Sequence, residues 1–156
     1  MKEINALNGV MDFHEKFGSY IGLTPAIPNT QTCELRKNLL QEELNEFKTA
    51  IDNNDLIEAA DALIDLQYVL SGAILAFGLH NVAYDLFEEV QRSNMSKLCK
   101  TMDEALATVE HYRTTKGFDS YIKAAGDLFV VKRFDDNKIL KSVGYSPCDL
   151  KSIIIK

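Results

Sequence analysis

The sequence predicts an all-α protein, an antiparallel bundle of four to five helices with a small C-terminal β-hairpin. Apolar residues recur every three or four positions over most of the first hundred residues, which is the spacing of amphipathic helices. The breaks between these stretches are mostly short, as is typical of antiparallel neighbours in a bundle. β-forming residues are instead concentrated in one late segment, 128–134 (LFVVKRF), which predicts the hairpin.

The first two thirds of the chain predict four helices, at about 4–18, 32–52, 55–78 and 81–98. A loop rich in glycine and proline separates the first two, and Thr32 is predicted to cap the second. Asn53 and Asn54 break the second helix, and Gly78 ends the third, because glycine is a common helix stop.

The last third is mixed. Residues 103–114 predict a fifth helix. Tyr121-Ile122 and the segment 128–134, followed by Ile139-Leu140 after a polar turn, predict an antiparallel hairpin or a three-stranded patch. Ser146-Pro147 is expected to open a short terminal helix. We expect one domain over 1–156, with its bundle core at about 1–100 and the extra helix and β patch at about 101–156.

Length, composition and charge exclude several classes of protein. The chain has 156 residues, 46% of them hydrophobic, and a net charge of −6, which argues against a partner nucleic acid bound by a basic surface. Its three cysteines form no C-x-x-C pair, which predicts reduced thiols and a cytoplasmic location. The uncharged stretch Leu66–Tyr84 has too short an apolar part to cross a membrane, so we expect a buried bundle helix.

Acidic residues at helical spacing are the most informative feature. Glu58, Asp61 and Asp65 lie at i, i+3 and i+7 and therefore share one helix face, and Glu43 and Glu46 share a face of the preceding helix. A carboxylate row on a largely apolar helix is costly unless a cation neutralises it. Oxygen ligands without nearby histidine or cysteine suit magnesium or manganese. The alternative is a solvated acidic surface.

A ferritin-like di-iron site would require paired E-x-x-H motifs. None of the three histidines, His14, His80 and His111, completes such a pair. The sequence therefore does not favour a di-iron site, and each histidine by itself is predicted to be a surface or partly buried residue rather than a ligand.

The segment 88–97 is the second feature of interest. Asn94 and Lys97 share a helix face, and Arg92 lies close by. An amide and cations suit a triphosphate that is also held by metal. The alternative is a polar helix end at which the helix dipole favours a lysine.

Four segments together resemble the all-α nucleoside triphosphate pyrophosphohydrolases, which include MazG-like enzymes, dimeric dUTPases and phosphoribosyl-ATP pyrophosphohydrolase. The segments are LRKNLLQEELNEF (35–47), EAADALIDLQYVLSGAILAFGL (58–79), LFEEVQRSNMSKL (86–98) and KILKSVGYSPCDLKSII (138–154). The combination of the E-x-x-E pair with SNMSK is the specific part of the resemblance.

The resemblance implies a helical domain that forms a homodimer or a dimer of dimers and hydrolyses a (deoxy)nucleoside triphosphate to the monophosphate and pyrophosphate. It implies magnesium ligands at Glu43 and Glu46. For the second pair two registers are open, one ending at Asp65 and one matching Glu58 with Asp61. The resemblance further implies that Glu42 positions the attacking water, with Glu43 as the other candidate catalytic residue.

Asn94 and Lys97 match the phosphate-binding positions of this family, and Arg92 is carried as a third candidate. The expected role is removal of unwanted nucleotides from the pool. Two alternatives remain at this point: hydrolysis of phosphoribosyl-ATP, and a non-catalytic helical dimer that senses a nucleotide. A purely structural dimer is a further alternative.

Overall fold

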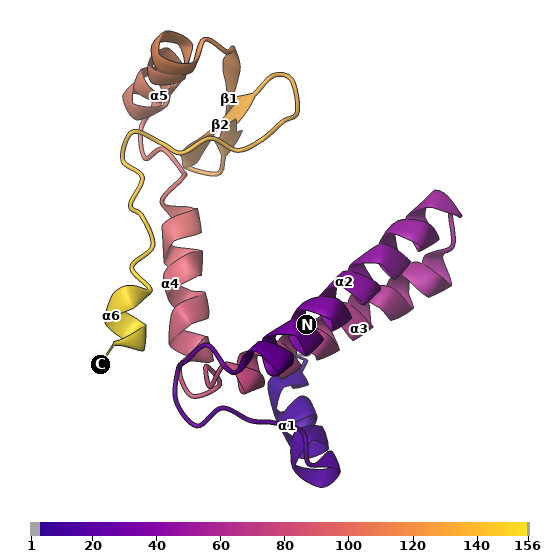
Figure 1. Cartoon of the computed structure of the whole chain (residues 1–156). Coiled ribbons are helices and arrows are strands. Elements are labelled where there is room, and N and C mark those ends of the chain that lie inside the picture. The colour runs from indigo at the N-terminus through magenta and orange to yellow at the C-terminus, as the bar shows by residue number, and fades with distance from the viewer. Residues whose placement is uncertain (1–3, 156) are drawn as a thin grey trace. The chain divides into compact units, whose positions relative to one another are not determined.

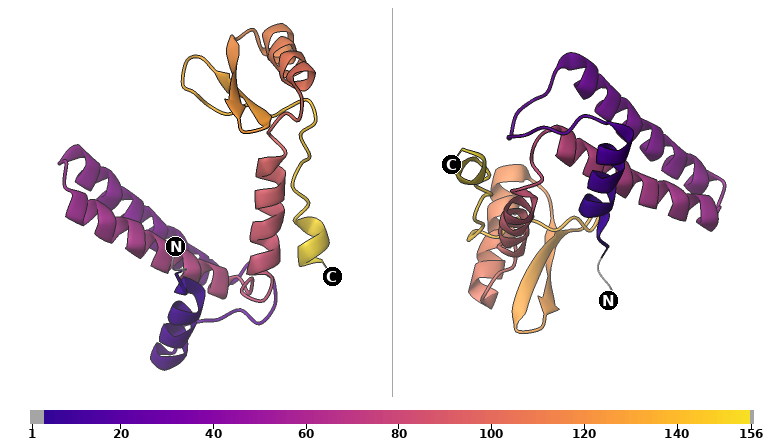
Figure 2. Two further views of the ribbon diagram at one scale, coloured as in Figure 1. Left: turned by 180° about the vertical axis from the view of Figure 1, so that it is seen from behind. Right: turned by 90° about the horizontal axis from the view of Figure 1, so that it is seen from below.

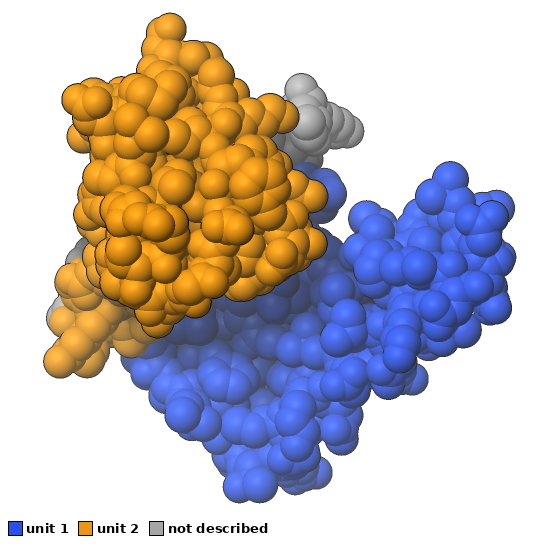
Figure 3. All heavy atoms as spheres, turned by 90° about the horizontal axis from the view of Figure 1, so that it is seen from above, with its two compact units in different colours: residues 1–84 blue, residues 85–156 orange. Residues whose placement is uncertain are grey.

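The computed structural model describes residues 4–155. The chain forms two compact units, Met1–Tyr84 and Asp85–Lys156, which are coloured blue and orange in Figure 3. Their boundary lies within the first turn of α4 (Ala83–Met95). A single domain over the whole chain stays a prediction.

Three helices build the first unit (Figure 1): α1 (Ala6–Phe17), α2 (Thr30–Asp52) and α3 (Leu56–Ala76). Helices α2 and α3 run antiparallel as a hairpin, and α1 packs against α3. The hairpin turn is tight because Asn54 adopts a positive φ of 53°, which asparagine tolerates better than most residues. Asp55 then caps α3, and its Oδ1 accepts hydrogen bonds from the amides of Ile57 and Glu58 at 3.0 and 3.1 Å.

The start of α2 differs from the prediction. The N-cap is Asn29, whose side chain accepts a hydrogen bond from the Thr32 amide at 2.9 Å, so the prediction that Thr32 caps this helix was wrong. Asparagine and threonine are both good cap residues, and helical periodicity alone could not choose between positions three residues apart.

The loop before α2 is held against the end of α3. The Gly22 amide donates to the Leu75 carbonyl at 2.9 Å, and the Ala26 amide donates to the Phe77 carbonyl at 3.1 Å. Gly78 has a φ of +67°, and a Cβ there would overlap the backbone of Thr24. This close approach explains why a glycine follows α3.

Burial along α3 is uneven. Apart from Ala62, its buried residues lie in the C-terminal half, which includes Ser71, Leu75 and Ala76. Leu56 and Ile57 at its start are more than three-quarters exposed. Within residues 4–155, α3 is also the helix that is long and apolar enough to span a membrane by length and composition, yet only 28% of its most apolar window is buried. Much of its apolar surface is therefore uncovered within this chain.

The second unit contains most of α4 (Ala83–Met95), followed by α5 (Met102–Lys116), β1 (Ser120–Ala125), β2 (Leu128–Arg133) and α6 (Lys151–Ile154). The two strands pair antiparallel from Ser120 opposite Arg133 to Ala125 opposite Leu128 and lie beside α5 (Figure 2). Their core is formed by four buried residues: Cys99, Ala105, Val131 and Leu140.

The predicted fold class, a helical protein with a small C-terminal hairpin, is confirmed. A third strand does not form in the described part of the chain, where Ile139 makes a single bridge to Lys132. Helix α4 ends at Met95, earlier than predicted, because Cys99 pairs with Phe129 of β2 through two backbone hydrogen bonds of 2.8 and 2.9 Å. The chain must leave the helix to make that pairing.

Candidate functional site

The acidic residues of interest lie on the α2–α3 hairpin. Glu43 is half-buried, and its Oε2 is buried with no hydrogen-bond partner among the described residues. The other five candidates are exposed: Glu42, Glu46, Glu58, Asp61 and Asp65. A buried carboxylate oxygen without a donor is costly to leave unpaired. Glu43 is therefore the position on the hairpin where a hydrogen-bond donor or a cation is missing among the described residues.

The electrostatics show which carboxylates gather around Glu43. Its pKa is raised above the ordinary glutamate value, first by burial and then by the negative charges of Glu46, Asp65, Glu42 and Asp61, in that order. Residues from both helices therefore act on the same carboxyl group. Both Asp61 and Asp65 take part, so this observation does not choose between the two registers of the second acidic pair.

Glu58 approaches the same region from the start of α3. Together with Glu46 and Asp55 it lines a cavity of about 410 Å³ between the two helices near the hairpin turn. Asp55 is already occupied as a helix cap. Glu46 and Glu58 thus provide carboxylates at a cavity between the helices, next to the cluster around Glu43.

The carboxylates are suited in kind to a hard divalent cation, although they are not closed around one point. Within residues 4–155, no three His, Cys, Asp or Glu side chains lie close enough to share one ion. The donor set is nevertheless all oxygen, which magnesium and manganese prefer. The unpaired Oε2 of Glu43 and its raised pKa are what a missing positive charge would relieve.

The predicted phosphate-binding residues lie in the second unit. Asn94 is exposed near the end of α4, and Lys97 follows it, half-buried. The Lys97 ammonium donates to Asn94 Oδ1 at 2.7 Å, as expected for side chains three residues apart. The structure therefore brings these two predicted residues together as a pair.

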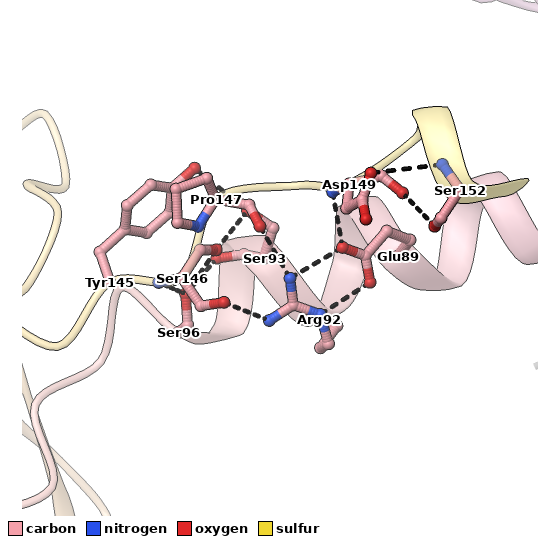
Figure 4. A network of polar contacts seen from close by, with 9 residues as sticks. All are labelled: Glu89, Arg92, Ser93, Ser96, Tyr145, Ser146, Pro147, Asp149 and Ser152. Atoms are coloured by element: carbon pink, nitrogen blue, oxygen red, sulfur yellow. Dashed lines mark hydrogen bonds and ion pairs between the residues drawn. The ribbon is translucent and has the colours of Figure 1, made fainter.

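Arg92 has a structural connection that the sequence did not indicate (Figure 4). Its guanidinium binds both carboxylate oxygens of Glu89, at 2.7 and 2.8 Å. It also donates to Ser146 Oγ and to the Pro147 carbonyl, both at 2.9 Å. The bidentate pair lowers the pKa of Glu89 to about 2. Arg92 thus ties the C-terminal segment to α4.

Two further polar residues were missed by the sequence analysis. His14 was predicted to be a surface or partly buried residue, yet it is 3% exposed, and Arg36 is 8% exposed. Arg36 Nη2 lies 3.4 Å from His14 Nε2. Arg36 lies three residues before Leu39 and therefore on an apolar face of α2. This spacing was the signal that could have predicted the burial of Arg36.

Comparison with known proteins identifies the family of this chain. The family model described as phosphoribosyl-ATP pyrophosphohydrolase matches residues 10–94, more than half of the chain. The chain belongs to this family. The match of the phosphoribosyl-ATP pyrophosphohydrolase family spans all of the candidate acidic residues together with Arg92 and Asn94, and ends before Lys97.

A viral protein aligns with this member of the phosphoribosyl-ATP pyrophosphohydrolase family over a longer stretch than the family model does. An uncharacterized protein of Acanthamoeba polyphaga mimivirus is 35% identical over 137 residues, which cover 76% of this chain and 54% of the relative. The chain therefore spans about half the length of the curated relative that it matches.

Proposed function

We propose that this protein hydrolyses a (deoxy)nucleoside triphosphate to the monophosphate and pyrophosphate, in a magnesium- or manganese-dependent reaction that removes unwanted nucleotides from the pool. The observation that carries the proposal is the buried Oε2 of Glu43, which has no hydrogen-bond partner in the described part of the chain and lies among carboxylates from two helices. Membership in a pyrophosphohydrolase family supports an acid anhydride as the bond that is cleaved.

The ligands for the cation are Glu43 and Glu46 on α2 and two or three of Glu58, Asp61 and Asp65 on α3. A bound ion supplies positive charge for the triphosphate and makes a bound water more acidic. Because these carboxylates repel one another without a cation, they should hold the ion most tightly when all of them are ionised.

The remaining residues act on the water and on the leaving group. Glu42 or Glu43 orients the attacking water toward the α-phosphorus and accepts its proton. The new bond joins the water oxygen to the α-phosphorus, and the bond that breaks joins the α-phosphorus to the oxygen bridging it to the β-phosphorus. Asn94 and Lys97, with Arg92 as a third candidate, stabilise the negative charge on the departing pyrophosphate.

A product assay tests the proposal. The purified protein is incubated with a panel of nucleotides and magnesium, and the products are identified by ion-exchange chromatography. We expect a monophosphate and pyrophosphate in equal amounts. Release of single phosphate, or no turnover of any nucleotide, would count against the proposal.

A matched pair of variants links turnover to the cluster. Glu46→Gln should abolish turnover with an unchanged circular dichroism spectrum. Glu34→Gln is the control, because Glu34 lies on the same helix but is exposed and paired with Lys37 at 2.6 Å. Equal activity of the two variants would remove the carboxylate cluster from the mechanism.

Phosphoribosyl-ATP is the second candidate substrate, because it is the one after which the matching family is named. It contains the same kind of triphosphate anhydride, so the proposed roles of the carboxylates would not change. Including phosphoribosyl-ATP in the nucleotide panel decides between the two substrates. Preferential turnover of phosphoribosyl-ATP would favour it over a (deoxy)nucleoside triphosphate as the substrate.

A nucleotide sensor without catalysis is a further candidate. It predicts magnesium-dependent binding without product, whereas a purely structural dimer predicts no magnesium effect at all. A ligand that binds only the native state raises the melting temperature. Melting curves with and without magnesium and a non-hydrolysable triphosphate, read together with the product assay, therefore separate the three.

We further propose that the protein works as a homodimer or a dimer of dimers in the cytoplasm, without nucleic acid or a membrane as partner. The uncovered apolar surface of α3, which includes Leu63 and Ile64 at about half exposure, supports a second copy as its cover. Light scattering should give at least twice the 17.5 kDa chain mass. A single-chain mass at all concentrations would contradict this part of the proposal.

A further inference from the structure

A second cavity lies within the first unit, between α1, α2 and α3. Its volume is about 270 Å³, and two of the residues that line it, His14 and Arg36, are more than nine-tenths buried. It is separate in its lining from the cavity beside Glu46. A buried guanidinium in a cavity of this size requires an explanation, because arginine is rarely buried without a partner.

Arg36 has no acidic partner among the residues that the structure describes. Within residues 4–155 it forms no salt bridge, and its Nε is buried without a hydrogen-bond acceptor. Its contact is His14, whose Nε2 lies 3.4 Å from Nη2. Removing an arginine from water without a compensating anion or acceptor is costly. The charge of Arg36 is therefore not compensated within residues 4–155, although Nε itself is enclosed.

His14 accepts from Arg36 rather than repelling it. Its Nδ1 lies 3.1 Å from the carbonyl oxygen of Tyr20, so Nδ1 carries the hydrogen and Nε2 presents a lone pair to the guanidinium. Burial and the nearby charge of Arg36 lower the pKa of His14, which keeps the ring neutral. The histidine thus contacts Arg36 through Nη2, and Arg36 makes no other side-chain hydrogen bond within residues 4–155.

The facing helix leaves space for the guanidinium. A Cβ at Gly72 of α3 would come within 2.9 Å of Arg36 Nη1 and 3.2 Å of His14 Nε2. Only a residue without a side chain lets both groups approach α3 at this point.

The remaining walls are apolar and aromatic apart from Ser19. Phe13 and Tyr68 meet edge to face with ring centroids 5.9 Å apart, and the other apolar side chains of the lining are Val10, Leu35, Leu39 and Val69. Phosphate would lose its hydration against such walls and gain a single arginine. A flat heterocycle would instead bury its faces and offer an edge to Arg36.

We propose that this cavity binds the base of the nucleotide and that Arg36 selects bases with two neighbouring hydrogen-bond acceptors on one edge. Guanine and hypoxanthine offer O6 and N7, and cytosine offers O2 and N3. Adenine places an amino group beside N7, and uracil has an N–H between its carbonyls. The inference rests on the proposed function and deepens it, because it disfavours adenine nucleotides, including phosphoribosyl-ATP.

Nucleosides test this selection independently of hydrolysis, because they have no triphosphate to cleave. Amide chemical shifts of the full chain are followed by NMR during titration with guanosine, inosine, cytidine, adenosine and uridine, without magnesium. We expect saturable shifts at Gly72 and Tyr68, with guanosine and inosine or else cytidine binding roughly 5- to 150-fold more tightly than adenosine. Equal binding of all five, or none, would overturn the proposal while leaving triphosphate hydrolysis untouched.

A variant then assigns the selection to one side chain. Arg36→Met removes the donors at similar volume, and Arg113→Met is the control because Arg113 is exposed on α5. We expect Arg36→Met to lose the preference between bases, in nucleoside binding and in kcat/KM, and Arg113→Met to keep it. A preference that survives in a folded Arg36→Met would assign Arg36 a purely structural role. If that variant does not fold, the wild-type titration decides.

Discussion

Glu43 carries a negative charge among other carboxylates without a hydrogen-bond donor in the described residues. Removing that charge is therefore predicted to stabilise the metal-free protein. The pKa of Glu43 is raised in the folded state, so the folded protein holds that proton more tightly than the unfolded chain does. Stability is then lost as the pH rises through the interval between the unfolded and the folded pKa. At pH 7 the ionised carboxylate is the destabilising form, and Glu43→Gln removes it.

The size of the effect follows from the number of neighbours. Four carboxylates raise the pKa of Glu43 in addition to burial, and like-charged neighbours cost about 0.2–0.5 kcal/mol each at exposed positions. Since solvent and salt screen these charges, we expect a gain of about 1 kcal/mol in the free energy of unfolding. For a chain of this length, that corresponds to about 2–4 °C in Tm.

The assay is thermal unfolding at pH 7 in low salt, with chelator and then with magnesium. Glu43→Gln should melt above the wild type in chelator and gain less from magnesium, because it removes both the repulsion and a ligand. Glu34→Gln, which breaks an exposed ion pair with Lys37, should melt close to the wild type in chelator and gain as much from magnesium as the wild type does. A Glu43→Gln protein that melts below the wild type in chelator would refute the reasoning.

Three further outcomes are expected. Gly78→Ala should lower Tm far more than Gly117→Ala, because both positions have a φ near +67° but only a Cβ at 78 meets backbone; similar losses in thermal unfolding would contradict the clash. Arg92→Met should speed amide hydrogen exchange in the C-terminal segment that this side chain ties to α4, whereas Arg113→Met should not; unchanged exchange would mean that other contacts hold the segment. The Glu89 carboxyl should titrate in NMR with a pKa of about 2. Its contribution to the free energy of unfolding is therefore fully present above the ordinary glutamate pKa and is lost as the pH falls toward 2. A titration near 4.5 would show that the Arg92 pair does not persist in solution.

Most helices could be predicted because their signals are local. Apolar spacing identified α1 to α5 with ends a few residues off, and the predicted hairpin is present. The errors occur where tertiary contacts compete with helix formation. Cys99 leaves the helical path to pair with Phe129, and the position of the α2 cap depends on which of several polar residues meets the Thr32 amide.

The candidate site divides in the same way. Helical spacing placed Glu43 and Glu46 on one face, and the hairpin brings Asp61 and Asp65 near them. No spacing rule connects Arg36 with His14, which are 22 residues apart. Nor could spacing connect Arg92 with Ser146, 54 residues further on. These contacts depend on how distant segments pack.

The sequence by itself determined the helical periodicity, the acidic faces and the family, because each of these is encoded in residues within a few turns of one another. Only the tertiary structure decided which carboxylate is buried without a partner among residues 4–155, that Arg36 lies in a cavity where none of these residues supplies a counter-charge, and that Arg92 holds the C-terminal segment. The physical reason is that burial and pairing depend on the neighbours supplied by other elements, and these set the pKa of a group and the cost of leaving it unpaired.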